Sequence, residues 1–281
     1  MRSERFFQKL FDESIYVVVL GVLVVFAAFP LLWILMTSFK PNSAIISETP
    51  IFVFQPTFEH WERVLVQTNF LVFYRNSLII AFGTVIVNAT AGTMAAYALA
   101  RGGLRYQENI AYFILSQRML PAVAVVLPIF ILASGIRALD RYETLIFINV
   151  AFNLPLSIWL IRSFVEGLPV EIEEAAVVDG ASWLGALVRV TLPQMRPAIF
   201  SSMLLTYIYT VNEFLFALIL SGSGTRPVSV AVQQFLPTGV RGTLFGEAAA
   251  ASILIMLPGL ILAVLLQRYL VAGISLGAVK G

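Results

Sequence analysis

The sequence predicts an all-helical membrane protein with six transmembrane helices and a polar helical segment between the fourth and fifth of them. Two observations support this fold class. Of the 281 residues, 59% are hydrophobic and 12% are charged, whereas soluble domains carry roughly 25% charged residues. The hydrophobic residues also gather in runs of roughly 20 or more, which is the length that a helix needs to cross a bilayer.

The composition excludes several kinds of site. The chain has no cysteine and a single histidine, His60, so we expect no disulfide, iron–sulfur cluster, thiol nucleophile or metal site. The net charge of +2 is too balanced to suggest a nucleic-acid partner. No lysine follows a GxxxxGK[ST] loop, so the chain has no nucleotide-binding P-loop. Any energy from ATP must therefore arrive through a partner.

Six apolar segments form a predicted transmembrane domain over residues 14–270. The spans are expected at about 14–39, 70–100, 109–133, 144–164, 198–220 and 248–270. The first span follows a mixed-charge segment, residues 1–13, and lacks the short apolar core and cleavage site of a secretory signal. Residues 271–281 form a C-terminal tail. An even number of spans puts both termini on one side, and the larger number of Lys and Arg there predicts that this side is cytosolic.

Small and polar residues recur every four positions in the second span, at Thr84, Asn88, Gly92 and Ala96. This spacing places them on one ridge of a helix, where a neighbouring helix can approach closely. The ridge predicts helix packing rather than contact with a substrate.

The longest polar interruption between spans is residues 171–197, which are too few and too polar to cross a bilayer. Glu171, Glu173 and Glu174 fall in the first turns of a predicted helix, where the helix dipole favours negative charge. The Asp179–Gly180 pair predicts the end of that helix.

A second short helix is predicted after this turn. Ser182 suits its N-cap, and Pro193 is expected to end it. In the first helix, Ala175 and Ala176 offer a shallow surface that another protein can approach closely. A solvated loop with well-formed helix ends would explain the same pattern without a partner.

The sequence EEAAVVDGASWLGALVRVTLP resembles the EAA signature of the permease subunits of ATP-binding-cassette importers. In that signature, E-A-A, three residues and then G are followed about a dozen residues later by L-P. The matching positions are Glu174, Ala175, Ala176, Gly180 and Leu192–Pro193, and Asp179–Gly180–Ala181 is as in the sugar-importing branch. The third and fourth spans and the tail QRYLVAGISLGAVKG are similar to MalG-type permeases of this family. The likeness covers essentially the whole chain.

The resemblance implies a permease subunit of a binding-protein-dependent (type I) sugar importer in the cytoplasmic (inner) membrane of a bacterium or archaeon. The expected partners are a non-identical sister permease, two copies of a cytosolic ATPase, an extracytoplasmic solute-binding protein, membrane lipid and a carbohydrate, with no nucleic acid. No cofactor is expected in this chain, because ATP and Mg belong to the ATPase. The chain itself is expected to catalyse nothing.

By the same resemblance, residues 171–197 include a coupling helix that docks in a groove of the ATPase. The residues assigned to this contact are Glu171, Glu174, Ala175, Ala176, Asp179, Gly180, Ala181 and Pro193. The Gly-rich loop 221–247 is expected to enter the binding protein, and a plain connector is the alternative. Its candidate contact residues are Gly222, Gly224, Thr225 and Arg226.

Arg118 and Glu213 are the formal charges deepest in the predicted spans, and a charge in a bilayer needs a partner or a wet cavity. One hypothesis is that both line the sugar path with the amides of Gln117, Asn153 and Asn212, because hydroxyl-rich ligands need such partners. The alternative is a structural ion pair or hydrogen bonds between helices.

Two other classes of protein fit the sequence less well. A secondary transporter needs inverted repeats and ion-binding carboxylates in the membrane, but only Glu213 lies in a predicted span and the two halves show no repeat. An intramembrane hydrolase needs a nucleophile with a base or a metal, which one loop histidine and no cysteine do not supply. Dependence of uptake on ATP would separate the permease from the secondary transporter.

Overall fold

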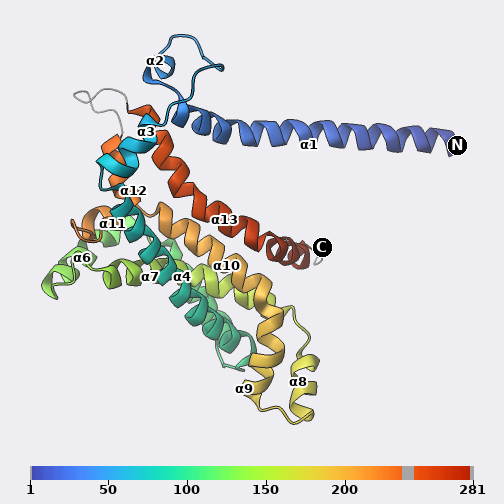
Figure 1. Cartoon of the computed structure of the whole chain (residues 1–281). Helices are drawn as coiled ribbons and strands as arrows, with labels where there is room; N and C mark the ends of the chain where they lie inside the picture. The colour runs from blue at the N-terminus through green and yellow to red at the C-terminus, as the bar shows by residue number, and fades with distance from the viewer. Residues whose placement is uncertain (1, 236–243, 279–281) are drawn as a thin grey trace. The chain divides into compact units, whose positions relative to one another are not determined.

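A computed structural model describes residues 2–235 and 244–278 of the chain, with side-chain detail for 15–233, 235 and 244–267. Every regular element in these ranges is a helix (Figure 1), so the predicted all-α class is confirmed. The chain divides into two compact units, which we describe separately. The first unit comprises Met1–Asn69 with Gln234–Leu254, and the second comprises Phe70–Gln233 with Ile255–Gly281.

The first unit contains a long apolar helix, three short helical elements and the beginning of the last helix. These are α1 (Arg2–Phe39), α2 (Asn42–Ile45), α3 (Glu59–Glu62), the π-helical turn η1 (Arg63–Gln67) and the first turns of α13 (Phe245–Ala278). The histidine of the chain, His60, is fully buried here. Among the residues that the structure describes, no group of three His, Asp or Glu side chains could hold a metal ion.

The second unit contains the remaining helices. They are α4 (Phe70–Arg101), α5 (Gln107–Ser116), η2 (Gln117–Met119), α6 (Ala122–Gly135), α7 (Tyr142–Glu166), α8 (Val170–Val178), α9 (Trp183–Ala186), η3 (Leu187–Thr191), α10 (Leu192–Asn212), α11 (Leu215–Leu220), α12 (Val228–Ala231) and the start of η4 (Val232–Phe235), followed by the rest of α13. The end of η4, from Gln234, belongs to the first unit. The predicted C-terminal tail is helical up to Ala278, and its last three residues, 279–281, lie outside the described part.

Four described helices are long and apolar enough to cross a membrane: Ile15–Phe39, Phe70–Arg101, Tyr142–Glu166 and Phe245–Gln267. A fifth candidate is the pair Gln107–Met119 and Ala122–Gly135, which bends by 89° at its break. The predicted span 198–220 falls in α10 and α11, which are separated by Glu213 and Phe214. The count of six spans therefore stays a prediction.

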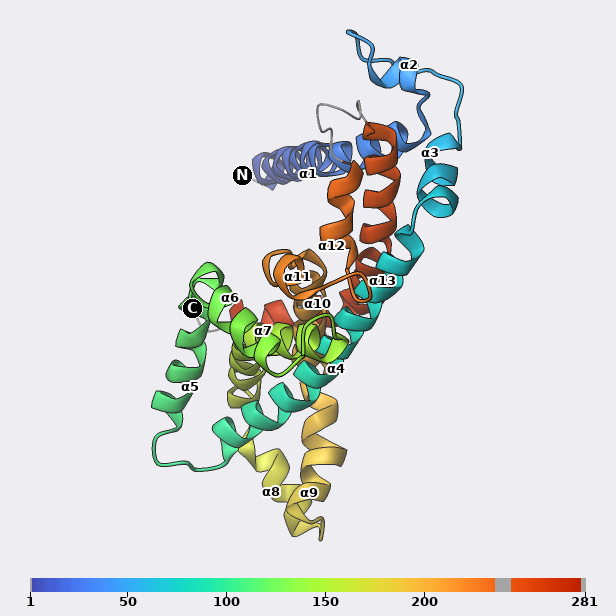
Figure 2. The same cartoon turned by 90° about the vertical axis from the view of Figure 1, so that its left-hand side faces the viewer.

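Helices α4, α7 and α10 pack against one another in the centre of the second unit (Figure 2). The ridge predicted on α4 lies at this contact, and Asn88 is fully buried there. Its amide donates to the Ser157 hydroxyl at 3.2 Å and to the Thr206 hydroxyl at 3.0 Å. A Cβ at Gly92 would lie 3.3 Å from the Cβ of Ser157. The prediction that this ridge serves helix packing is therefore confirmed.

Candidate functional site

Two short helices, α8 and α9, lie side by side at one end of the second unit (Figures 1 and 2). α8 ends at Val178, and Gly180 takes a left-handed φ of 93°, which glycine adopts without steric strain. The Ser182 hydroxyl accepts the backbone N–H of Gly185 at 3.1 Å and caps α9. The predicted helix, turn and capped second helix are all present.

A buried glutamate, Glu173, links α8 through hydrogen bonds to the C-terminal ends of α4 and α7. Its side chain accepts hydrogen bonds from Arg101 Nε at 3.1 Å and from the Tyr97 hydroxyl at 2.8 Å. Arg101 Nη2 also donates to the carbonyl oxygens of Val165 at 2.9 Å and Leu168 at 2.7 Å. The carboxylate and the guanidinium are both largely removed from solvent, so this contact holds α8 against two span ends.

The other two glutamates at the start of α8, Glu171 and Glu174, are exposed. The sequence analysis assigned Glu171 and Glu174 to the site and did not predict that Glu173 anchors the helix, because the three glutamates are of the same residue type and lie close together in the chain. Glu173 is the buried residue of α8 and lies one helical turn before the half-buried Val177, but nothing in the local sequence marks it out from the two exposed glutamates.

The outer surface of α8 and α9 mixes acidic and large apolar side chains. Val178 is 86% exposed, Trp183 65% and Leu184 70%. Ala175 and Asp179 are also exposed, whereas Ala176 and Ala181 are half-buried. Apolar residues gathered in this way on a polar, water-facing element are typical of a surface that binds another protein.

The expectation that Pro193 ends the second helix is wrong. α9 passes through the π-helical turn η3 into α10, which begins at Leu192. Pro193 therefore lies at the start of α10, directly after the π-helical turn, and does not end a helix. As a result, the chain is helical without interruption from Trp183 to Asn212.

A second cluster of polar residues lies at the break between α5 and α6. Arg118 Nη1 donates to the carbonyl oxygen of Phe152 at 2.9 Å, and its guanidinium lies 4.5 Å from the ring centroid of Tyr209. Gln117 precedes Arg118, and Asn212 lies about one turn after Tyr209; both are exposed. Of the predicted path residues, Arg118 thus contacts Tyr209, an aromatic residue that the sequence analysis did not include, whereas the amides of Gln117 and Asn212 donate to the carbonyl oxygens of Phe113 and Ile208 in their own helical segments.

The two other predicted path residues make hydrogen bonds within their own helical segments. The Glu213 carboxylate accepts the backbone N–H groups of Phe216 at 2.7 Å and Ala217 at 2.9 Å, so it caps α11. Asn153 is buried and donates to the carbonyl oxygen of Asn149 at 2.8 Å. Among the ion pairs of the described side chains, none joins Glu213 to an arginine. Their place in a substrate path stays a prediction.

The first part of the loop 221–247 wraps around the carboxylate of Asp140. The backbone N–H groups of Gly222, Gly224 and Thr225 donate to it at 2.9, 3.0 and 2.8 Å, and the Thr225 hydroxyl donates at 2.7 Å. A Cβ at Gly222 would lie 2.6 Å from the carboxylate, so glycine is needed for this approach. Arg226 is exposed. Residues 236–243 of the same loop lie outside the described part of the chain.

These donors control the ionisation of Asp140. Desolvation alone would raise the pKa of this carboxyl group, but the hydrogen bonds from Thr225, Gly224 and Gly222 outweigh it and hold the pKa below its usual value. Because the folded pKa is the lower one, the stabilising contribution is fully present above the unfolded pKa of about 3.9 and is lost as pH falls through the folded value.

We expect Asp140→Asn to destabilise the loop by about 1–3 kcal/mol at pH 7, because an amide cannot accept all four donors. The check is the thermal unfolding midpoint of the purified protein, which should be lower in the variant at pH 7. The difference from wild type should shrink below pH 4. An unchanged midpoint at pH 7 would show that the Asp140 contact contributes nothing.

Packed membrane helices, a broken polar span and an anchored helix pair with an open surface together define an integral membrane transport subunit. The chain belongs to the family of binding-protein-dependent transport system inner membrane components, whose profile matches residues 88–276.

Two relatives and one solved structure illustrate the likeness. The chain is 34% identical to the trehalose/maltose transport system permease protein MalG of Thermococcus litoralis, over 92% of this chain and 94% of that protein. It is 32% identical to the trehalose transport system permease protein SugB of Mycobacterium tuberculosis, over 96% and 98% of the two chains. The fold is similar to a chain of a bacterial ABC transporter involved in alginate import, with a TM-score of 0.76, 24% identity, and 96% and 98% of the two chains covered. The resemblance to MalG-type permeases is confirmed.

Proposed function

We propose that this chain is the permease subunit of an ATP-driven importer that carries a di- or oligosaccharide, a polyol or a related carbohydrate. The family places it in a binding-protein-dependent transport system of the inner membrane. The relatives named for trehalose and maltose support a carbohydrate as the cargo. ATP and Mg are held by a partner ATPase, and this chain contributes no catalytic group.

The observation that carries the proposal is the anchored helix pair α8–α9. Its inner side is fixed to α4 and the end of α7 through Glu173 and Arg101, and its outer side is open. α9 continues into α10 without a break in the helix. A push on the outer surface by an ATPase would therefore move α4, α7 and α10 together, which is how nucleotide-driven closure would reach the membrane.

The cluster around Arg118 is the proposed contribution of this chain to the translocation path. Tyr209 offers a ring face for a sugar, and Gln117 and Asn212 offer amide donors and acceptors. Arg118 lies beside the 89° break between Gln107–Met119 and Ala122–Gly135, and membrane proteins tolerate such breaks where they are buried in protein or line a water-filled cavity. A non-identical sister permease would complete the path from the other side.

The proposed importer also contains two ATPase copies and a solute-binding protein. Two copies of the ATPase would bind α8–α9 and its counterpart on the sister subunit, in the cytosol with both termini of this chain. A solute-binding protein would deliver the sugar on the opposite side. Because Gly222, Gly224 and Thr225 hold Asp140, these residues would shape the base of the contact loop, and Arg226 would be free to touch the binding protein.

Reconstitution of the full assembly in proteoliposomes tests this function. With the binding protein outside and ATP inside, radiolabelled trehalose or maltose should accumulate, and vesicles loaded with ADP should take up none. Uptake that follows a proton or sodium gradient and needs no ATPase subunit would contradict the proposal and favour a secondary transporter.

A further inference from the structure

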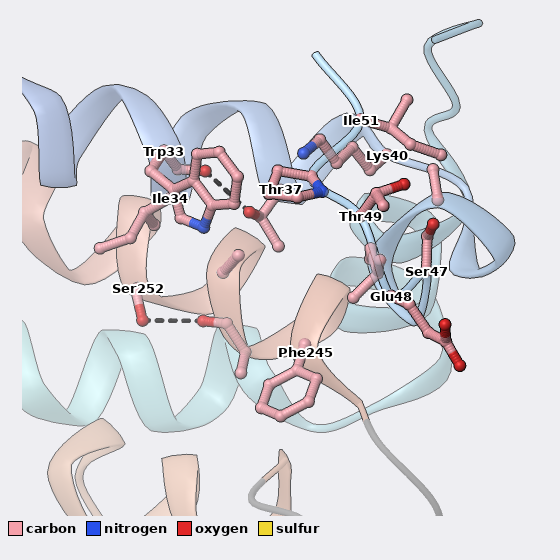
Figure 3. A pocket seen from close by; sticks show the side chains of 15 residues that line it. Trp33, Ile34, Thr37, Lys40, Ser47, Glu48, Thr49, Ile51, Phe245 and Ser252 are labelled. Carbon is pink, nitrogen blue, oxygen red and sulfur yellow. Dashed lines mark hydrogen bonds between the residues drawn. The ribbon is translucent and has the colours of Figure 1, made fainter. Parts of the chain in front are cut away.

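The first unit contains an open cavity of about 470 Å³ at the polar ends of two apolar helices (Figure 3). The last turns of α1 contribute Trp33, Ile34 and Thr37, and α13 contributes Ser252. The segment between α1 and α3 closes another side and places Glu48 at the cavity. A cavity of this size suits a small molecule or the head of a larger one.

The side chain of Lys40 lines this cavity, and the residue is only 3% exposed. Its ammonium lies over the ring of Trp33 (Figure 3), 4.3 Å from the ring centroid, and 5.6 Å from the ring centroid of Phe54. No described carboxylate or hydrogen-bond acceptor pairs with this ammonium. A buried ammonium is unfavourable without a counter-ion, so this cavity is suited to an anionic group.

The backbone of Lys40 is held in place by buried groups. Its carbonyl oxygen accepts a hydrogen bond from His60 Nε2 at 2.8 Å. His60 Nδ1 lies 3.3 Å from a Glu247 carboxylate oxygen, and Arg63 donates to the other oxygen at 2.8 Å. A Cβ at Gly246 would lie 2.3 Å from the His60 ring, so the helix start fits closely around it. The position of Lys40 is therefore preorganised.

We propose that this cavity binds the phosphate headgroup of an anionic phospholipid, with the Lys40 ammonium pairing with a phosphate oxygen. Trp33 and Ile34 belong to an apolar run that is long enough to cross a bilayer, and Lys40 directly follows it. The cavity thus lies at the level where lipid headgroups meet water. Glu48 at the cavity edge can accept the hydroxyl groups of a glycerol headgroup.

A lipid explains the lining better than a free anion does. Most of the residues that face the cavity are apolar or small, including Ala44, Ile45, Phe245 and Ala248. These side chains would contact the glycerol backbone and the first acyl carbons, whereas inorganic phosphate would leave them in water. The site is separate from the helix pair α8–α9 and does not depend on the proposed transport function.

The test uses the full-length chain purified with the subunits with which it assembles. Native mass spectrometry would compare dioctanoyl phosphatidylglycerol with dioctanoyl phosphatidylcholine. The anionic lipid should bind about tenfold more tightly or better, as a charge-assisted contact would give. Lys40→Gln should abolish that preference, and Arg75→Gln, which removes an exposed cation at the start of α4, should keep it.

Acetylation of Lys40 in the wild-type assembly provides a second measurement that needs no substitution. Phosphatidylglycerol should protect Lys40 from acetylation, and phosphatidylcholine and inorganic phosphate should not. Equal protection by inorganic phosphate would show a free-anion site and overturn the lipid assignment. An unprotected Lys40, or a lipid preference unchanged in Lys40→Gln, would overturn the site itself.

Discussion

Replacing Glu173 with alanine is expected to release α8 from α4 and to uncouple ATP hydrolysis from sugar uptake. The substitution leaves the Arg101 guanidinium largely buried without its carboxylate and removes the acceptor of the Tyr97 hydroxyl. Breaking a buried pair in this way costs about 3 kcal/mol. Hydrogen exchange of the α8 amides should rise by about 100-fold, since each 1.4 kcal/mol is a factor of ten.

The matched control is Glu171→Ala, which removes the same charge from the same helix at an exposed position. It should leave the hydrogen exchange of α8 unchanged. In proteoliposomes, Glu173→Ala should hydrolyse ATP with little uptake. Slow exchange and normal uptake in Glu173→Ala would show that Glu173 does not anchor the helix.

Val178→Asp is expected to prevent binding of the ATPase while leaving the permease folded. Val178 is 86% exposed, so the change should alter stability by no more than about 0.5 kcal/mol. If the side chain is covered by the ATPase, the new carboxylate is buried without a partner, and affinity should fall about 100-fold or more. The measurement is the amount of ATPase that copurifies with the tagged permease.

Leu104→Asp is the control for this experiment. Leu104 is 46% exposed in the turn after α4, which the predicted order of six spans puts on the same side of the membrane as α8. The Leu104→Asp permease should copurify with the ATPase as the wild type does. Equal retention by Val178→Asp would exclude the end of α8 from the interface.

Local signals in the sequence were sufficient to predict the helix pair. The Asp179–Gly180 turn and the Ser182 cap depend on short-range backbone chemistry, and both are present. The anchor could not be predicted, because it depends on Arg101, which is 72 residues away in the chain. No short-range pattern distinguishes Glu173 from its acidic neighbours.

The roles of Pro193 and Glu213 depended on where the helices begin and end. Pro193 was expected at a helix end, but the preceding turn is π-helical and continues directly into α10. Glu213 was expected inside a continuous span, but the helix breaks beside it and its carboxylate caps α11. Periodicity and composition do not locate such breaks within an apolar run.

The most direct test of the coupling account uses the absence of cysteine in the natural chain. A single cysteine at Val178, labelled with a short photo-cross-linker, should form an adduct with the ATPase subunit in the assembled transporter. A cysteine at the exposed Ser223, in the loop that holds Asp140, should form none with it. An ATPase adduct from Ser223 and none from Val178 would contradict the account.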